Sequence, residues 1–177
     1  MRRLRKNLTA AVAALALAGC GSSNTATTGT TGPAISRCTT GQLEATLGEP
    51  GGTGGTTTDY PLSLRNTGTS ACTIQGYAGV LFVAGDDNHQ IGQAASRDTG
   101  SAPTITLSHG QTASATLGIV DPANFPPDCD PTPPTGLRVS PPDQTASLLI
   151  DPAGTACSNS KYATLHIGPF QGPFQSP

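Results

Sequence analysis

The sequence contains no tryptophan and a single methionine, and aromatic residues make up only 4% of its 177 positions. The three tyrosines, Tyr60, Tyr77 and Tyr162, are scattered, so the sequence does not indicate an aromatic platform on which sugars or bases would stack. Charged residues are also scarce, at 11%, and the helix-forming residues Lys, Glu and Met are few. With 22 glycines and 16 prolines, this composition excludes a helical bundle and favours short strands joined by turns.

Positive charge is nearly absent beyond the N-terminal segment. After Cys20 the chain has five basic and eleven acidic side chains, a net charge of −6 with histidine neutral. A protein that binds nucleic acid or anionic lipid by surface charge needs a basic stripe, and none is present. We therefore expect no nucleic-acid partner.

The sequence also lacks two short motifs of common hydrolases. Gly-x-Ser-x-Gly and His-Glu-x-x-His do not occur. The three histidines, His89, His109 and His166, fall in different expected hairpins or strands, which argues against a three-histidine metal site. We expect no catalytic residues, no cofactor and no metal. One alternative stays open, an envelope hydrolase whose site combines His109 or His166 with an acid.

The first twenty residues have the pattern of an export signal. Basic residues crowd positions 2–6, and the apolar run Leu8–Leu17 is too short to span a bilayer, which takes about 20 residues. The following Leu17-Ala18-Gly19-Cys20 resembles the bacterial lipobox. We expect a lipoprotein signal peptide over 1–19, a lipid-modified Cys20, and attachment to the extracytoplasmic face of the plasma membrane. The alternative is a plain secretory signal.

The segment from 20 to 36 is rich in Thr, Gly and Ser and has little to bury. Such composition is typical of a disordered linker, which here would tether the domain to its lipid anchor. The density of threonine also leaves O-glycosylation open.

Residues 37–170 have the pattern of an all-β domain. In Thr56–Arg65, Leu62 and Leu64 alternate with polar residues, the two-residue period of a half-buried strand. Gln111–Ile119 alternates in the same way, and we expect it to form a hairpin with Pro103–Leu107. The prolines in 122–134 exclude a central strand there. We expect residues 171–177 to form a C-terminal tail. The other expected strands are Cys72–Gln75, Gly79–Ala84, His89–Gly92, Leu137–Val139, Ala146–Ile150 and Tyr162–Ile167, with a strand or helical turn at Gln42–Gly48. Their regular spacing indicates a two-layer β-sandwich.

Four cysteines remain when Cys20 is set aside. They are Cys38, Cys72, Cys129 and Cys157. An even number in an exported domain indicates disulfides, with three possible connectivities. The pairing that is local in sequence, Cys38 with Cys72 and Cys129 with Cys157, is the simplest and is our prediction. A metal site is the competing interpretation, but no Cys-x-x-Cys pair is present.

Several of these features together resemble one known family. They are the lipobox, the Thr/Gly linker, Cys38, the run Leu62-Ser63-Leu64-Arg65-Asn66, Cys72, Gly76-Tyr77, Leu107, Gly110-Gln111, Leu137-Arg138-Val139, Pro141-Pro142, Cys157 and Gly168-Pro169. The pattern is similar to that of actinobacterial lipoproteins carrying the domain of unknown function 4232. The resemblance covers roughly Cys38 to Phe170 and departs at Ala78 and His109, where proline is usual. It implies an exported immunoglobulin-like sandwich with paired cysteines, and it carries over no catalytic residues.

Acidic side chains in two loops are the candidate binding residues. Asp86 and Asp87 belong to a hairpin turn, and Asp128 and Asp130 belong to the proline-rich loop. The alternating acids of a calcium-binding EF-hand are missing. Loops at the ends of a sandwich vary without disturbing the core, so these acids suit a basic or polar protein partner, another polar envelope component or a weakly bound cation. We therefore predict a non-enzymatic binding module, with a passive structural lipoprotein as a further alternative.

Overall fold

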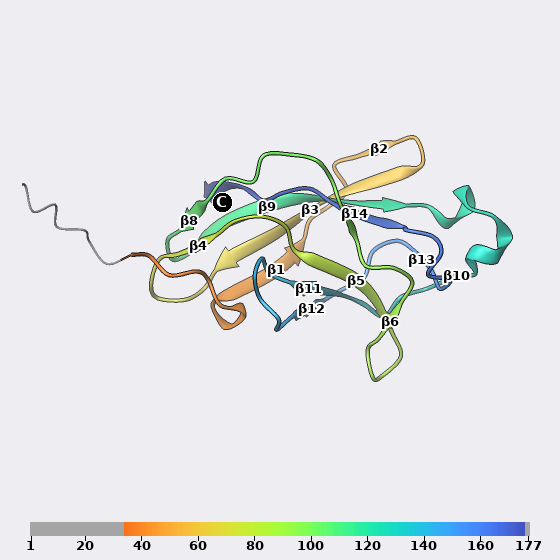
Figure 1. Cartoon of the computed structure of the whole chain (residues 1–177), viewed down its shortest axis with the longest axis horizontal. Coiled ribbons are helices and arrows are strands. Elements are labelled where there is room, and N and C mark those ends of the chain that lie inside the picture. The colour runs from red at the N-terminus through yellow and green to blue at the C-terminus, as the bar shows by residue number, and fades with distance from the viewer. Residues whose placement is uncertain (1–33, 176–177) are drawn as a thin grey trace, which may run out of the picture. The chain divides into compact units, whose positions relative to one another are not determined.

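The computed structural model describes residues 34–175, so the expected signal peptide at 1–19 and most of the expected linker lie outside the described residues. Within 34–175 the chain forms β-strands and three 3-10 helices, without an α-helix (Figure 1). No helix in this range has the length and apolar character needed to cross a membrane. The elements in chain order are η1 (Thr40–Gln42), β1 (Leu43–Leu47), β2 (Gly52–Gly54), β3 (Thr57–Asn66), β4 (Cys72–Ile74), β5 (Gly79–Ala84), β6 (His89–Ile91), β7 (Ser96–Arg97), β8 (Ile105–Leu107), β9 (Gln111–Val120), η2 (Pro122–Asn124), η3 (Pro127–Cys129), β10 (Pro131–Thr132), β11 (Gly136–Ser140), β12 (Leu148–Ile150), β13 (Ala156–Cys157), β14 (Leu165–Ile167) and β15 (Gln171–Gln175).

The larger sheet has seven strands, and β3 and β9 form its centre. Its order is β1-β3-β9-β14-β7, with β2 added beside β3 and β15 beside β9. Only the β14–β7 pair is parallel. The alternation in β3 and β9 sets the register, since Leu62 pairs with Ala115 and Leu64 with Ala113, all four buried. Side chains of one parity therefore face the core and those of the other parity face outward.

The second sheet has four strands in the order β12-β11-β5-β6. Its inner face carries Val80 and Phe82 of β5, which pair with Val139 and Leu137 of β11. These side chains are at most 1% exposed and belong to the same core cluster as the inner residues of β3 and β9. The core thus lies between the two sheets, and each large side chain buried there contributes roughly 1.5–3 kcal/mol.

Two disulfides join segments outside these sheets' centres. Cys38 bonds to Cys72 and Cys129 bonds to Cys157, and all four cysteines are at most 2% exposed. The predicted number and pairing of disulfides are confirmed. The bridged residues are 34 and 28 positions apart, so each bond removes about 3–4 kcal/mol of unfolded-chain entropy in the loop-closure account.

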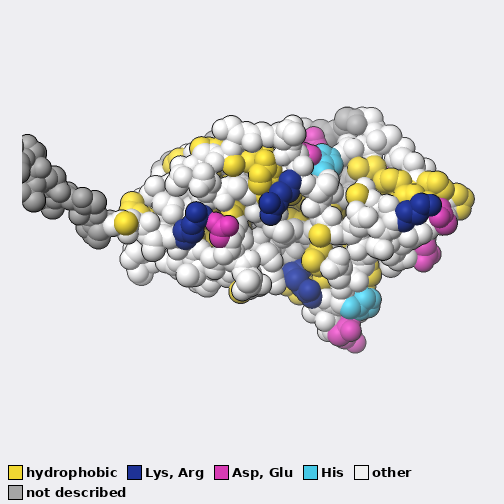
Figure 2. Space-filling model, viewed as in Figure 1, with side chains coloured by type: hydrophobic (Ala, Val, Ile, Leu, Met, Phe, Trp, Pro, Cys, Tyr) yellow, Lys and Arg dark blue, Asp and Glu magenta, His cyan; other side chains and the backbone are white. Residues whose placement is uncertain are grey.

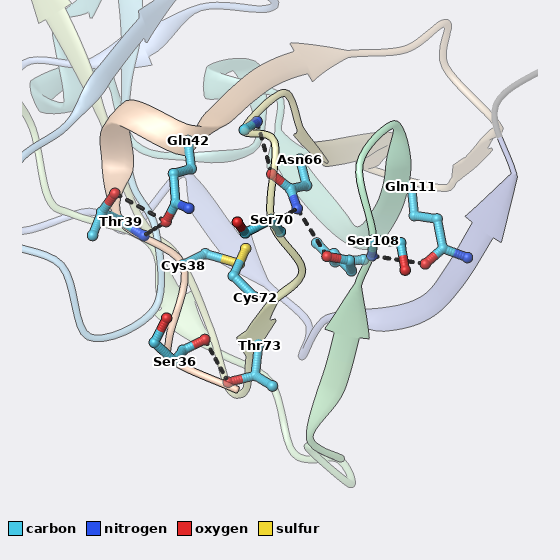
Figure 3. The surroundings of a disulfide bond; sticks show 12 residues. Ser36, Cys38, Thr39, Gln42, Asn66, Ser70, Cys72, Thr73, Ser108 and Gln111 are labelled. Atoms are coloured by element: carbon cyan, nitrogen blue, oxygen red, sulfur yellow. Dashed lines mark hydrogen bonds between the residues drawn. A yellow bond between two sulfur atoms is a disulfide. The ribbon is translucent and has the colours of Figure 1, made fainter. Parts of the chain in front are cut away.

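A buried asparagine ties the chain together beside the first disulfide (Figure 3). Asn66 is fully buried, and its amide nitrogen donates to the carbonyls of Ser70 (2.9 Å) and Leu107 (2.8 Å). Its amide oxygen accepts from the backbone N–H of Gly68 at 2.9 Å. Because every polar atom of the side chain has a partner, burial of this amide is not penalised.

One predicted pairing is wrong. The strand at Ile105–Leu107 pairs with β4, and not with β9 as the expected hairpin required. The turn itself is present, since the N–H of Gln111 donates to the carbonyl of Ser108 at 3.0 Å. The pairing differs because β9 pairs along its length with β3, while the bond from Asn66 to Leu107 holds β8 beside the disulfide-linked β4.

The ends of the domain extend further than expected. Residues 171–175 do not form a tail beyond the domain but form β15, whose register partners on β9 include Ser114 and Thr112. Ser36, assigned to the linker, accepts a backbone hydrogen bond from Thr73 at 2.9 Å. The glycine-rich segment before β3 also joins the larger sheet, because β2 pairs with the start of β3. Backbone pairing, which needs no apolar side chain, explains why these segments belong to the domain.

Candidate functional site

The two pairs of candidate acids lie in separate loops. Asp86 and Asp87 lie in the β5–β6 turn, and Asp128 and Asp130 lie at η3. Within 34–175, no group of three or more His, Cys, Asp and Glu side chains is placed to hold a metal ion. Figure 2 shows that basic and acidic side chains are dispersed on the face in view, with no basic patch.

Three of the four candidate carboxylates already have partners within the chain. Nδ1 of His89 lies 2.8 Å from Oδ1 of Asp87, and this hydrogen bond is the main cause that lowers the pKa of Asp87. The hydroxyl of Tyr162 donates to Asp128 at 2.6 Å, and that of Ser158 donates to Asp130 at 2.7 Å. The last two bonds hold the η3 loop against residues 158–162, so Asp128 and Asp130 have a structural role in the free domain.

The three histidines have different hydrogen-bond partners at Nδ1. Nδ1 of His109 lies 2.9 Å from the carbonyl oxygen of Gly68. Nδ1 of His166 lies 2.9 Å from Oδ2 of Asp98, with the two side chains 30% and 43% exposed. Asp98 is itself fixed, because its N–H donates to Ile167 (3.0 Å) and its carbonyl accepts from the Tyr77 hydroxyl (2.9 Å). His166 is therefore a histidine oriented by a carboxylate.

The imidazole of His166 lies over a glycine in the neighbouring strand. A Cβ placed on Gly118 would come within 1.9 Å of Nε2 of His166, so only glycine leaves room for the ring. Gly118 is the register partner of both His166 on β14 and Asp59 on β3. Paired residues present their side chains on the same face of a sheet. Asp59 and His166 therefore flank Gly118 on the outer face of the larger sheet.

A groove of about 530 Å³ lies on this face next to Asp59. Its floor comes from β3 and β9, and its sides come from the chain before β2 and from the segment between β14 and β15. The lining residues are Gly51, Asp59, Tyr60, Pro61, Ser114, Ala115, Thr116, Gly168, Pro169 and Gln171. Proline rings and glycine backbone supply an apolar surface, while Thr116 and Gln171 add polar groups.

Asp59 is the single charged residue that lines the groove. It is partly buried. Its carboxylate makes no hydrogen bond or ion pair with any residue in the part of the chain that the structure describes, although its backbone carbonyl accepts from Gly51 at 2.9 Å. A mostly apolar concavity of this size with few polar groups is the usual form of a ligand site.

The profile of a family described as a domain of unknown function, DUF4232, matches residues 38–171. This chain belongs to the DUF4232 family. No curated protein matches the sequence. No solved structure matches it.

In this DUF4232 domain, the matched range includes both disulfides, His166 and every residue that lines the groove. Sequence reasoning missed the groove because its residues come from four separate segments between positions 51 and 171. A signal was present in the outward positions of β9, where Ser114 and Thr116 alternate with buried residues. It became informative only when the register placed Pro61 and Gly168 beside Thr116.

Proposed function

We propose that this protein is an exported lipoprotein of the cell envelope whose folded domain binds a partner and catalyses nothing. In this proposal, a diacylglyceryl group on Cys20 holds the chain to the outer face of the plasma membrane. The two-layer domain belongs to the immunoglobulin-like class, in which antiparallel sheets pack over inward-facing alternate residues. The groove on the outer face of the larger sheet is the binding site.

Two disulfides that follow a leader-like N-terminal segment are the main observation in favour of export. Disulfides persist in oxidising compartments outside the cytoplasm and are rare inside it. Both bonds use buried cysteines, and no described cysteine remains unpaired. The basic start, the short apolar run and Leu17-Ala18-Gly19-Cys20 support a lipid anchor, since two acyl chains suffice for stable attachment.

The groove supports binding rather than catalysis. Its volume of about 530 Å³ falls within the usual range for small-ligand sites. A nucleophilic hydrolase needs a nucleophile within hydrogen-bond reach of its base. Among residues 34–175, His166 has a hydrogen bond to Asp98 but none to a serine, threonine or cysteine side chain.

An envelope hydrolase is the second candidate, and the His166–Asp98 pair is what favours it. A carboxylate bonded to Nδ1 orients a histidine for general-base work through Nε2. A screen of the purified protein against esterase, peptidase, phosphatase and glycosidase substrates distinguishes a binding module from a hydrolase. We expect no turnover. Turnover that His166→Ala abolishes, and that His109→Ala leaves intact, would establish the hydrolase instead.

Export is tested by proteolysis of intact cells. The domain of an exported protein is digested when protease is added outside, while a cytoplasmic marker stays whole. We expect protease added to intact cells to digest the 34–175 segment once a reductant has opened its two disulfides. Protection of the domain until the cells are lysed would contradict export.

A further inference from the structure

We propose that the groove binds its ligand through a cationic ammonium or guanidinium group placed at Asp59. This inference rests on the proposed function of the domain as a binding module, and it adds the chemical class of the ligand. The ligand has a positive end and a short aliphatic stem. A free amine and a lysine or arginine side chain of a peptide share this chemistry.

Asp59 differs from every other acidic residue of the domain. Seven of the eleven acids have a hydrogen bond or ion pair through their carboxylate; they are Glu44, Asp87, Asp98, Asp121, Asp128, Asp130 and Asp143. The remaining four are Glu49, Asp59, Asp86 and Asp151. Three of these are exposed, so water solvates their charge, and only Asp59 is partly buried. A carboxylate that is partly removed from water without a partner is destabilising, and a bound cation would relieve this cost.

The charges around the groove favour a cation and oppose an anion. Among the residues that the structure describes, no lysine, arginine or histidine lines the groove. Across Gly118 from Asp59, His166 is hydrogen-bonded to the Asp98 carboxylate, so this pair brings no unpaired positive group to the face. The chain after Cys20 also carries a net charge of −6, which steers cations toward the domain.

The rest of the groove suits an aliphatic stem. The rings of Pro61 and Pro169 and the backbone of Gly168 give an apolar surface next to the carboxylate. Lysine and arginine side chains lay their methylene groups along such surfaces while the charged end stays with a polar partner. Thr116 and Gln171 offer a hydroxyl and an amide to the neutral part of the ligand.

The test is a binding titration of the full-length chain, purified in detergent, followed by the NMR signals of the groove residues. The probes are 1,5-diaminopentane, a capped Gly-Lys-Gly peptide and the same peptide with its lysine acetylated. The variant is Asp59→Asn, which keeps the shape of the side chain and removes its charge. The matched control is Asp151→Asn, which removes an unpaired carboxylate from the exposed position after β12.

We expect a cationic probe to bind with a dissociation constant of about 1 mM or below. Asp59→Asn should weaken that binding at least about tenfold, which corresponds to the loss of one charged contact, and Asp151→Asn should leave it unchanged. Binding of the diamine indicates a free amine as the source, and binding of the lysine peptide alone indicates a peptide. The acetylated peptide should not bind.

Two results would overturn the inference. One is the absence of binding by both cationic probes, and the other is cationic binding that Asp59→Asn does not weaken. If the acetylated peptide binds in the groove equally well, the ligand class is wrong while the binding module stands. Turnover of any substrate in the enzyme screen would instead contradict the proposed function itself, so the two failures are distinguishable.

Discussion

The imidazole of His166 and the backbone of Gly118 occupy adjoining space on the outer face of the larger sheet, so closely that a Cβ on Gly118 would lie 1.9 Å from Nε2 of His166. The absence of a side chain at Gly118 therefore leaves room for the Nε2 end of the ring beside β9, while Nδ1 stays bonded to Asp98.

Replacing Gly118 by alanine should displace the His166 ring and break its hydrogen bond to Asp98. Overpacking of this kind typically costs about 1–3 kcal/mol of the free energy of unfolding. Denaturant unfolding monitored by circular dichroism measures the loss. Gly41→Ala is the matched control, because a Cβ there meets nothing within 4 Å.

A double variant separates the clash from other effects of the substitution. In a His166→Ala background the ring is gone, so Gly118→Ala should cost much less than it does alone. If Gly118→Ala lowers the free energy of unfolding equally with and without the His166 ring, the close approach of ring and glycine is not the cause of the loss.

Asn66→Asp should destabilise the domain, although the side chains have the same shape. A carboxylate cannot donate to the carbonyls of Ser70 and Leu107, which the amide nitrogen of Asn66 now satisfies. Each polar group left buried without a partner costs roughly 1–3 kcal/mol. The control is Asn124→Asp, an exposed asparagine whose amide donates to Asp121. A wild-type free energy of unfolding for Asn66→Asp would mean that the hydrogen bonds of Asn66 to Ser70 and Leu107 do not stabilise the domain.

Removing either disulfide should lower the free energy of unfolding by about 2–5 kcal/mol, the usual range for small exported domains. The paired variants are Cys38→Ala with Cys72→Ala, and Cys129→Ala with Cys157→Ala. The two losses should be similar, because the bridged segments have similar lengths of 34 and 28 residues. Peptide mapping without reductant checks the pairing directly. A free thiol at any of the four positions in the untreated protein would refute it.

Local patterns predicted the strands well. The alternation of Leu62 and Leu64 and that of Ala113, Ala115 and Leu117 correspond to the inner faces of β3 and β9. The disulfide pairing was also predicted, because each bond joins two cysteines that follow one another among Cys38, Cys72, Cys129 and Cys157. The strand pattern depends on residues near one another along the chain, and the disulfide pairing depends only on the order of the cysteines.

Features that depend on distant pairing were not predicted. The partner of β8 could not be read from its neighbours, because the turn at Ser108–Gln111 is compatible with a hairpin or with a change of sheet. The groove needs the register of β3 on β9, which brings Asp59 and Thr116 to one face. The contacts of Asp128 and Asp130 with residues 158–162 likewise join loops separated by about thirty positions.

The proposed function requires that a lipid on Cys20 holds a disulfide-bonded binding domain outside the plasma membrane. Mass spectrometry of the N-terminal peptide of the membrane-extracted protein tests it most directly. We expect a mature chain that begins at Cys20 and carries a thioether-linked diacylglyceryl group. We also expect the Cys20→Ser variant to be released or to stay unprocessed. A correctly cleaved Cys20→Ser protein that stays in the membrane, or an unmodified Cys20 in the wild type, would contradict it.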